Sequence, residues 1–599
     1  MLRPNARQIA TICLILLGIL FFCTIMRGEF GPPHEMLMAV GAMLLLVIWP
    51  LGRRIGLLIN SLDEFLKPQW IGCLLTFLIS CGYLSYELYV VRDWLFPKVH
   101  DEHLYMIQAR MLAIGKLWMP PIPQPLTNFF DNFYLFVQPV YATIYFPGTA
   151  LLLVPFIWLH LPWWLMTLGT TSLAAVVFYL IIREFFGPTR GLLAVVMLIT
   201  QTEYRLASSS LLSEAPNILM LLLLLWGWMQ FRKKPSLSWA TALGAIAGLA
   251  AIVRPLDAFC YALVIVAAIV FENRKRPRAL LISTAVAIAA AAPFLILQAV
   301  QNYGETGHWL KYGQTLYYEQ NYPAPPIGFY PLKPPSTAPA PWPEKQDWAV
   351  WLREFYQLHN QESIWTIWWK YRLRHTLFLS LPNNLMTILL PAALLSMLDI
   401  RRVAMLMIAL IFLTAYTLYV FILDHYMIPM LPIAIFFAIA GWDCIERAWP
   451  RQKPQITAAI SLALLGLTLG MLPELNEKTI IDNSIYAEQI LINDVLAQLP
   501  KQPVVVMFRY DPDAQGNPHD LTFHNEPTYN DDVAWPDDAP IIRTRDLGPR
   551  ENAQLFAYYA AHQPDRIFYL YDRAAGLYGR NPLHRLGSAT QLAAEDPVK

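Results

Sequence analysis

Long apolar segments recur along most of this chain and limit what it can fold into. A helix needs about 20 apolar residues to cross the hydrocarbon core of a bilayer. By this measure the sequence predicts thirteen membrane spans, at residues 8–26, 36–52, 70–91, 162–182, 190–209, 212–231, 237–253, 257–272, 279–299, 378–398, 402–422, 427–446 and 455–473. The pattern indicates a mainly α-helical, polytopic membrane protein.

Charged residues are scarce and unevenly distributed. Only 15% of the 599 residues are charged, against about 25% in soluble domains, which excludes an ordinary soluble protein and a disordered one. Residues 1–474 hold 33 basic and 25 acidic residues and the remainder holds 11 and 18, so the net charge of +1 divides into +8 and −7. No basic run is long enough to indicate a nucleic-acid partner. We therefore expect a membrane-embedded module at 1–474 and a separate domain at 475–599.

The basic residues between the spans predict the orientation of the chain, because cytoplasmic loops are enriched in Lys and Arg. With thirteen spans and a cytoplasmic N-terminus, every basic cluster falls on the cytoplasmic side. Three polar segments, 92–161, 300–377 and 475–599, are then predicted on the opposite face. Residues 147–161 are apolar but short, and we expect a helix lying at that outer surface.

The first outer loop carries two adjacent carboxylates just after the third span. Asp101 or Glu102 could act as a general base toward an acceptor hydroxyl. Both residues also suit the positive end of a helix, and the capping and catalytic roles are compatible. On the helix expected here, Tyr105 lies one turn further along and can continue the same site.

Metal ligands are a weaker interpretation of this loop. His100 and His103 flank the two acids, but the loop offers no further partner in a typical ligand spacing, and no cysteine pair has C-x-x-C spacing. A divalent metal is conceivable but not predicted, and no cofactor is implied.

Other charged residues gather where later spans meet the outer face. Glu214 stands at the start of the sixth span, where capping is the simpler role, although charges are costly so close to hydrocarbon. Arg254 could hold a phosphate or merely pair with Asp257. The last outer mouth holds His425 and Tyr426.

The loop at 300–377 is rich in aromatic residues and proline. Its basic residues, among them Lys311 beside Tyr312, are candidates to bind an anionic headgroup. Aromatic side chains suit sugar surfaces, but they also favour the membrane interface, which is the safer interpretation of the tryptophans at 365–369.

The C-terminal segment is predicted to form a small α/β domain. Apolar, strand-like runs occupy residues 503–508 and 566–571, with an amphipathic helix at 552–562 between them. Its two acidic pairs, Asp531–Asp532 and Asp537–Asp538, are expected to be solvated rather than to bind a cation.

The sequence shows no nucleotide-binding or hydrolase motif in a convincing context. This absence argues against a soluble nucleotide as the energy source. A transferase working at the outer face would need an activated donor on that side, and a lipid-linked donor fits.

At these residues the sequence resembles the GT-C glycosyltransferase superfamily, in particular its bacterial branch of aminoarabinose transferases and protein O-mannosyltransferases. The resemblance covers roughly residues 90–450. It is carried by Asp101-Glu102 with Tyr105 and Ala109-Arg110, Tyr145-Phe146-Pro147-Gly148, Leu212-Ser213-Glu214, Arg254-Pro255, and His425-Tyr426 before Pro429. Relatives more often have arginine where His425 stands.

The resemblance implies a polyprenyl-phosphate-linked sugar donor reached from the membrane lipid and a glycan, lipid or protein acceptor in the periplasm. Asp101 would be the general base of an inverting transfer, and Glu102 would orient the acceptor or share that role. The implied location is the bacterial inner membrane, with the site and the C-terminal domain facing the periplasm. Candidate substrate-binding residues are Tyr105, Arg110, Glu214, Arg254, Lys311, Tyr312, His425 and Tyr426.

Two other functions fit the same composition. A polytopic transporter predicts essential charges near the middle of its spans, and its variants would alter uptake rather than glycan composition. An oligosaccharide transferase or ligase using a lipid-linked glycan would transfer a preassembled chain, so the mass added to the acceptor distinguishes it from a one-sugar transferase.

Overall fold

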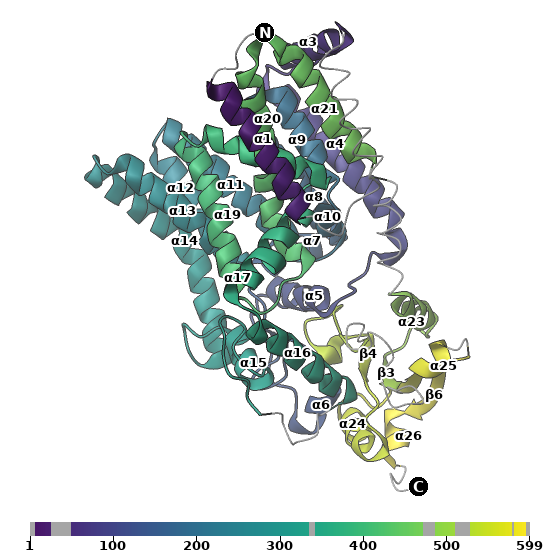
Figure 1. Ribbon diagram of the computed structural model, residues 1–599. Coiled ribbons are helices and arrows are strands. Elements are labelled where there is room, and N and C mark those ends of the chain that lie inside the picture. The colour runs from purple at the N-terminus through teal and green to yellow at the C-terminus, as the bar shows by residue number, and fades with distance from the viewer. Residues whose placement is uncertain are drawn as a thin grey trace.

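The computed structural model describes residues 6–25, 50–334, 342–470, 472, 486–509, 527–577 and 580–594. Long helices form a body at one end of the molecule, and a small sheet lies near the other end (Figure 1). The expected combination of a mainly α-helical body with a small C-terminal α/β region is confirmed.

Six helical segments of the described chain are long and apolar enough to cross a membrane. They are α4 (Gln69–Val90), α8 (Trp164–Phe186), α13 (Pro255–Asn273), α14 (Pro277–Thr306), α19 (Ile400–Leu418) and the run Asp424–Ala448, which joins η6 (Asp424–Met430) to α20 (Leu431–Ala448). The body also contains α1 (Ala6–Ile25), α3 (Pro50–Phe65), α12 (Leu237–Val253) and α21 (Lys453–Gly470). These segments make the chain a multi-pass membrane protein. The predicted span 36–52 lies almost wholly outside the described residues, and the count of thirteen and the orientation remain predictions.

The predicted span at 190–209 is wrong as a single helix. The structure forms α9 (Pro188–Ile199) and α10 (Thr202–Ser209), and α10 meets α11 (Glu214–Lys233) at 114°. The break inside the predicted span follows Ile199, where the Thr200 hydroxyl donates to the Val196 carbonyl oxygen (2.9 Å). Serine hydroxyls end α10 in the same way, Ser208 donating to the carbonyl oxygen of Arg205 (2.7 Å) and Ser210 to that of Leu206 (2.5 Å). The sharp bend places the start of α11 inside the protein.

The predicted span at 378–398 is broken as well. It is built from α18 (His375–Ser380), η4 (Asn384–Leu389) and η5 (Pro391–Ser396). The helical run Ile364–Ser380, which ends with α18, meets the run Asn384–Ser396 at an angle of 109°. Pro382 cannot donate an N–H to continue α18, and the Asn383 side chain accepts from the Leu385 N–H (2.9 Å) to start a new segment.

The first outer loop folds into short elements. They are η1 (Arg92–Trp94), α5 (His100–Ala113), η2 (Gln124–Leu126), α6 (Thr127–Phe130), the strand pair β1 (Leu135–Phe136) and β2 (Ala142–Thr143), and the apolar helix α7 (Gly148–Trp158). The helix predicted within 147–161 is confirmed. With 11 residues it rises only about 16 Å, too short to cross a bilayer core of about 30 Å.

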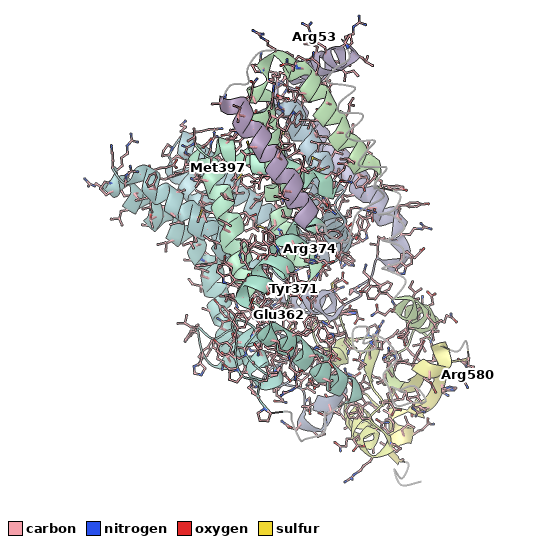
Figure 2. The ribbon with its side chains drawn as sticks, in the orientation of Figure 1. Arg53, Glu362, Tyr371, Arg374, Met397 and Arg580 are labelled. Atoms are coloured by element: carbon pink, nitrogen blue, oxygen red, sulfur yellow. The ribbon has the colours of Figure 1, made fainter. Side chains whose placement is uncertain are left out.

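The second outer loop contributes α15 (Gly313–Asn321), α16 (Pro343–Gln361), α17 (Ile364–Thr366) and the π-helical segment η3 (Ile367–Arg374). Figure 2 shows Arg374, Tyr371 and Glu362 following one another from the helical body toward α16. This segment therefore links the body to the loop elements below it.

The C-terminal region is a four-stranded sheet with flanking helices. Its elements are α23 (Ala487–Ala497), β3 (Val504–Arg509), η8 (Pro536–Asp538), β4 (Ile541–Arg545), α24 (Pro549–His562), β5 (Ile567–Asp572), α25 (Arg573–Leu577), β6 (Leu583–Ser588) and α26 (Ala589–Ala594). The strand order is β4-β3-β5-β6, with β3 parallel to both neighbours and β6 antiparallel to β5. Both predicted strands and the predicted helix are present.

The helix α5 lies between the helical body and this sheet (Figure 1). Arg53, in α3, and Arg580, just before β6, lie at opposite ends of the molecule (Figure 2).

Candidate active site

Asp101 lies in the first turn of α5, against a loop tyrosine. The Tyr145 hydroxyl donates a hydrogen bond to Asp101 Oδ1 (2.5 Å), and the ring of Tyr105, one turn along α5, lies 5.0 Å from the Tyr145 ring. Two amides fix Tyr145 in turn, because Gln108 Nε2 and Gln301 Nε2 both donate to its carbonyl oxygen, at 2.8 Å and 3.0 Å. The carboxylate is therefore held by a tyrosine that is itself anchored to two helices.

Burial raises the pKa of the Asp101 carboxyl above its ordinary value. The hydrogen bond from Tyr145 lowers that pKa, as do His425 and Arg254, while Glu214 raises it, and burial outweighs the lowering effects. A raised pKa suits a general base, whose best value lies near the working pH. Asp101 therefore interacts with Glu214, Arg254 and His425, which are more than a hundred positions away in the sequence.

Removing the Tyr145 hydroxyl is expected to move the acid limb of the pH profile. In Tyr145→Phe, Asp101 loses a donor that stabilises its charged form, so its pKa rises further above the ordinary value. Because the base works only when deprotonated, activity is then lost at a higher pH on acidification. We expect kcat against pH to show this shift. Tyr330→Phe, which changes an exposed tyrosine, serves as the control, and an unchanged acid limb in Tyr145→Phe would contradict this relation.

Glu102 points away from Asp101 and binds the backbone. Its Oε2 accepts from the N–H groups of Lys98 (2.7 Å) and Val99 (3.3 Å), and its Oε1 accepts from the Leu211 N–H (2.7 Å). The side chain is only 1% exposed. These contacts cap α5 and tie it to the break between α10 and α11. They correspond to the capping role foreseen for the acidic pair, and a part of Glu102 in the chemistry stays a prediction.

Replacing Glu102 by alanine is expected to destabilise the protein without removing the base. Buried N–H groups left without an acceptor cost about 1–3 kcal/mol each. We expect a lower midpoint in thermal unfolding and a kcat per folded molecule that falls far less than in Asp101→Asn. Asp538→Ala, which removes an exposed carboxylate, is the matched control. A kcat loss as large as that of Asp101→Asn would show instead that Glu102 takes part in the chemistry.

A buried ion-pair cluster forms where α11 and α13 begin. The Arg254 guanidinium pairs with Glu214, donates through Nε to Asp257 Oδ2 (3.0 Å) and through Nη1 to Ser213 Oγ (3.1 Å). Asp257 also accepts from the Tyr416 hydroxyl (2.8 Å). The sequence left two roles open for Arg254, holding a phosphate or pairing with Asp257. The pair with Asp257 is present, and Glu214 pairs with the same guanidinium.

His425 and Tyr426 join this cluster from η6. His425 Nε2 lies 3.8 Å from Glu214 Oε1, and the Arg254 guanidinium lies 4.7 Å from the centre of the Tyr426 ring. Tyr105, Glu214, Arg254, His425 and Tyr426 therefore gather around Asp101. They come from four separate parts of the chain.

Three other candidates lie elsewhere. Arg110 is nine residues after Asp101, which places it on the opposite side of α5, where it interacts electrostatically with Asp532. Lys311 pairs with Glu319 (2.5 Å) near the surface. Tyr312 packs edge-on against Phe146, with ring centres 5.2 Å apart.

The C-terminal acids are not simply solvated, contrary to expectation. Asp531 Oδ2 accepts from His103 Nδ1 (2.7 Å), and Asp537 accepts from the hydroxyls of Tyr558 (2.7 Å) and Tyr559 (2.6 Å). Within the described part of the chain, no group of three or more His, Cys, Asp or Glu side chains could hold a metal ion.

Several residues of the cluster were not predicted from the sequence. Tyr145 was noted only within the Tyr145-Phe146-Pro147-Gly148 motif, and Asn217, Gln301 and Tyr416 were not recognised. Asn217 donates to Asp257 Oδ2 (2.8 Å). A polar residue in an apolar segment was the available signal for Asn217, because such residues are costly in a membrane unless they have partners.

Comparison with known proteins gives one match in sequence and several in structure. Residues 151–297 match the family model described as dolichyl-phosphate-mannose-protein mannosyltransferase. This segment runs from α7 to α14 and includes Glu214 and Arg254, while Asp101 precedes it. No curated protein matches the chain.

The similar solved structures share little sequence with this chain. ArnT from Cupriavidus metallidurans bound to undecaprenyl phosphate has a TM-score of 0.43 at 13% identity, covering 86% of this chain and 99% of that one. The Archaeoglobus fulgidus oligosaccharyltransferase in complex with Zn and sulfate has a TM-score of 0.43 at 11% identity, covering 67% and 53%. AglB from the same organism, in complex with an inhibitory peptide and a dolichol-phosphate, has a TM-score of 0.42 at 11% identity, covering 69% and 56%.

The family match lies in the helices that carry the buried ion-pair cluster. Together with the expected multi-pass helical body, the match over residues 151–297 supports membership of the GT-C superfamily of glycosyltransferases.

Proposed function

We propose that the protein transfers one sugar from a polyprenyl-phosphate-linked donor to an acceptor hydroxyl at the periplasmic face of the bacterial inner membrane. Asp101 is the general base, and the configuration at the anomeric carbon inverts. The acceptor is a glycan, a lipid or a protein. The family description, which names a lipid-phosphate-linked mannose, supports the kind of donor.

The proposed reaction is a direct displacement. Asp101 takes the proton of the acceptor hydroxyl while that oxygen forms a bond to the anomeric carbon. The bond from the anomeric carbon to the phosphate oxygen breaks, and its electron pair leaves with the lipid phosphate. Attack on the side opposite the leaving phosphate inverts the anomeric centre. Tyr145 holds the carboxylate in the orientation that receives the proton.

Glu214, Arg254 and His425 form the second part of the proposed site. The Arg254 guanidinium is fixed by its carboxylate partners, so its charge stays in place as negative charge develops on the phosphate. We assign donor contacts to this cluster together with Tyr105 and Tyr426. Lys311 and Tyr312, on the loop beyond Phe146, are proposed to contact the donor where it approaches the site.

The observation that carries this proposal is the meeting of Asp101 with the Glu214–Arg254–His425 cluster. The Asp101 carboxyl, whose pKa is raised, interacts electrostatically with Glu214, Arg254 and His425, and the Arg254 guanidinium is partly buried and paired with Glu214. Residues 151–297, which include Glu214 and Arg254, match the family described as dolichyl-phosphate-mannose-protein mannosyltransferase. A base and a fixed cation on the two sides of a reacting carbon are what such a displacement needs.

Mass spectrometry of envelope glycans and lipids tests the proposal in cells. A deletion strain is compared with strains expressing the wild-type chain and Asp101→Asn. With envelope proteins analysed alongside, we expect one glycan, lipid or protein species to lose the mass of a single sugar in both mutant strains. Normal envelope species in both, or a change in uptake alone, would reject the proposal, and loss of a preassembled chain would favour a ligase.

A further inference from the structure

The helix α5 is divided between two hydrophobic cores. Its side with Tyr105, Met106 and Ala109 packs with residues of α7 and with Leu211. Its other side, with Leu104, Ile107 and Met111, shares a core with residues of the C-terminal sheet and α24, including Val505, Met507 and Leu555. Asp101 lies on the first side and His103 on the second. The second side of the helix that carries the proposed base therefore belongs to a core that the first outer loop and the C-terminal region build together.

One polar contact joins α5 to that region close to Asp101. His103 Nδ1 lies 2.7 Å from Asp531 Oδ2, and the His103 ring stacks on Tyr529 with centres 4.8 Å apart and planes 6° apart. His103 is only 8% exposed. A buried imidazole held both by a carboxylate and by a parallel ring fixes the rotation of α5 about its axis, two residues from Asp101.

The sheet also forms hydrogen bonds with the loop that follows α5. In parallel sheets, ligands ordinarily bind outside the carboxyl ends of the strands. Here Arg545, at the end of β4, donates to the carbonyl oxygen of Asp131 (2.5 Å) and to Asn132 Oδ1 (2.5 Å), and Thr544 donates to the Phe129 carbonyl oxygen (3.0 Å). Residues 129–132 thus occupy part of the edge where a small molecule would otherwise bind.

We propose that the C-terminal region positions the catalytic helix, with His103 and Asp531 as the positioning residues that set the place of Asp101. This inference rests on the proposed function of Asp101. The region then contributes to the rate without touching the substrate, because a displacement of about 1 Å in a reacting group can cost about 100-fold. It also gives the C-terminal region a role that needs no ligand of its own.

A double-mutant cycle on the full-length protein in lipid nanodiscs tests this proposal. The variants are Asp531→Ala, His103→Ala and the double variant. The donor probe is a synthetic short-chain polyprenyl-phosphate mannose, offered with a solubilised envelope glycolipid and peptide fraction. We expect kcat per folded molecule to fall roughly 10- to 100-fold in each single variant, with KM for the donor unchanged. The double variant should lose no more than either single one, because both remove the same contact.

Further variants separate the possible results. Asp531→Asn keeps an acceptor oxygen for the His103 N–H and should restore most of the kcat. Asp538→Ala, an exposed acid of the same region, should leave kcat unchanged. Additive losses in the cycle, or a normal kcat in Asp531→Ala while Asp101→Asn is inactive, would overturn the positioning role alone. Full activity of Asp101→Asn in the same assay would overturn the proposed function instead.

Discussion

Replacing Asp101 by asparagine is expected to reduce sugar transfer by about 10²–10⁴-fold, the usual contribution of a positioned general base. The amide has nearly the shape of the carboxylate and can still accept a hydrogen bond from Tyr145, so the fold should persist. It cannot take a proton from the acceptor hydroxyl. The chemical step should therefore fail while the donor still binds.

The measurement is single-turnover transfer by purified Asp101→Asn protein, with thermal unfolding as the check on folding. Asp93→Asn is a matched control, because Asp93 lies in the same loop, is exposed and pairs only loosely with Arg92 (3.9 Å). We expect wild-type rates from that control. Transfer by Asp101→Asn within a few-fold of wild type would remove Asp101 from the role of base.

Replacing Arg254 by leucine is expected to destabilise the protein by about 3–5 kcal/mol, because it leaves buried carboxylates without their cation. Glu214 and Asp257 are 2% and 0% exposed and both pair with Arg254. The variant should also lose transfer, since the positive charge proposed to stand beside the leaving phosphate is gone. We therefore expect Arg254→Leu to lose both stability and transfer.

Unfolding in detergent micelles measures this loss, with Arg232→Leu as the matched control. Arg232 pairs with Glu272 but is 37% exposed, and exposed pairs contribute only about 0–1 kcal/mol. A stability of Arg254→Leu equal to that of the control would mean that the cluster is solvated rather than buried. Normal transfer by a folded Arg254→Leu protein would separate Arg254 from the chemistry.

Much of the site was predictable because charge is rare in this chain. Asp101, Glu214 and Arg254 stand near the ends of apolar segments. An unpaired charge is costly there, so a charged residue at such a position indicates a structural or functional role. The sequence also predicts the strands at 503–508 and 566–571 from their apolar runs. These are local signals, and the structure confirms the elements they predict.

The contacts that complete the site are not local and were missed. Glu102 caps α5 but also accepts the N–H of Leu211, 109 residues away, and no spacing rule links the two positions. The breaks after Ile199 and Ser380 escaped the hydropathy pattern, because apolar segments lie on both sides of each break. The contact between α5 and the C-terminal region joins side chains more than 400 residues apart, such as His103 and Asp531.

The most direct test of the central claim is the fate of an isotope-labelled sugar. Purified full-length protein is given polyprenyl-phosphate mannose labelled at the anomeric carbon, and the product is analysed by mass spectrometry and nuclear magnetic resonance. We predict that wild-type protein moves a single labelled mannose to an acceptor hydroxyl with inverted configuration and releases lipid phosphate, while Asp101→Asn leaves the donor intact. Equal transfer by both proteins, or retention of configuration, would contradict the account.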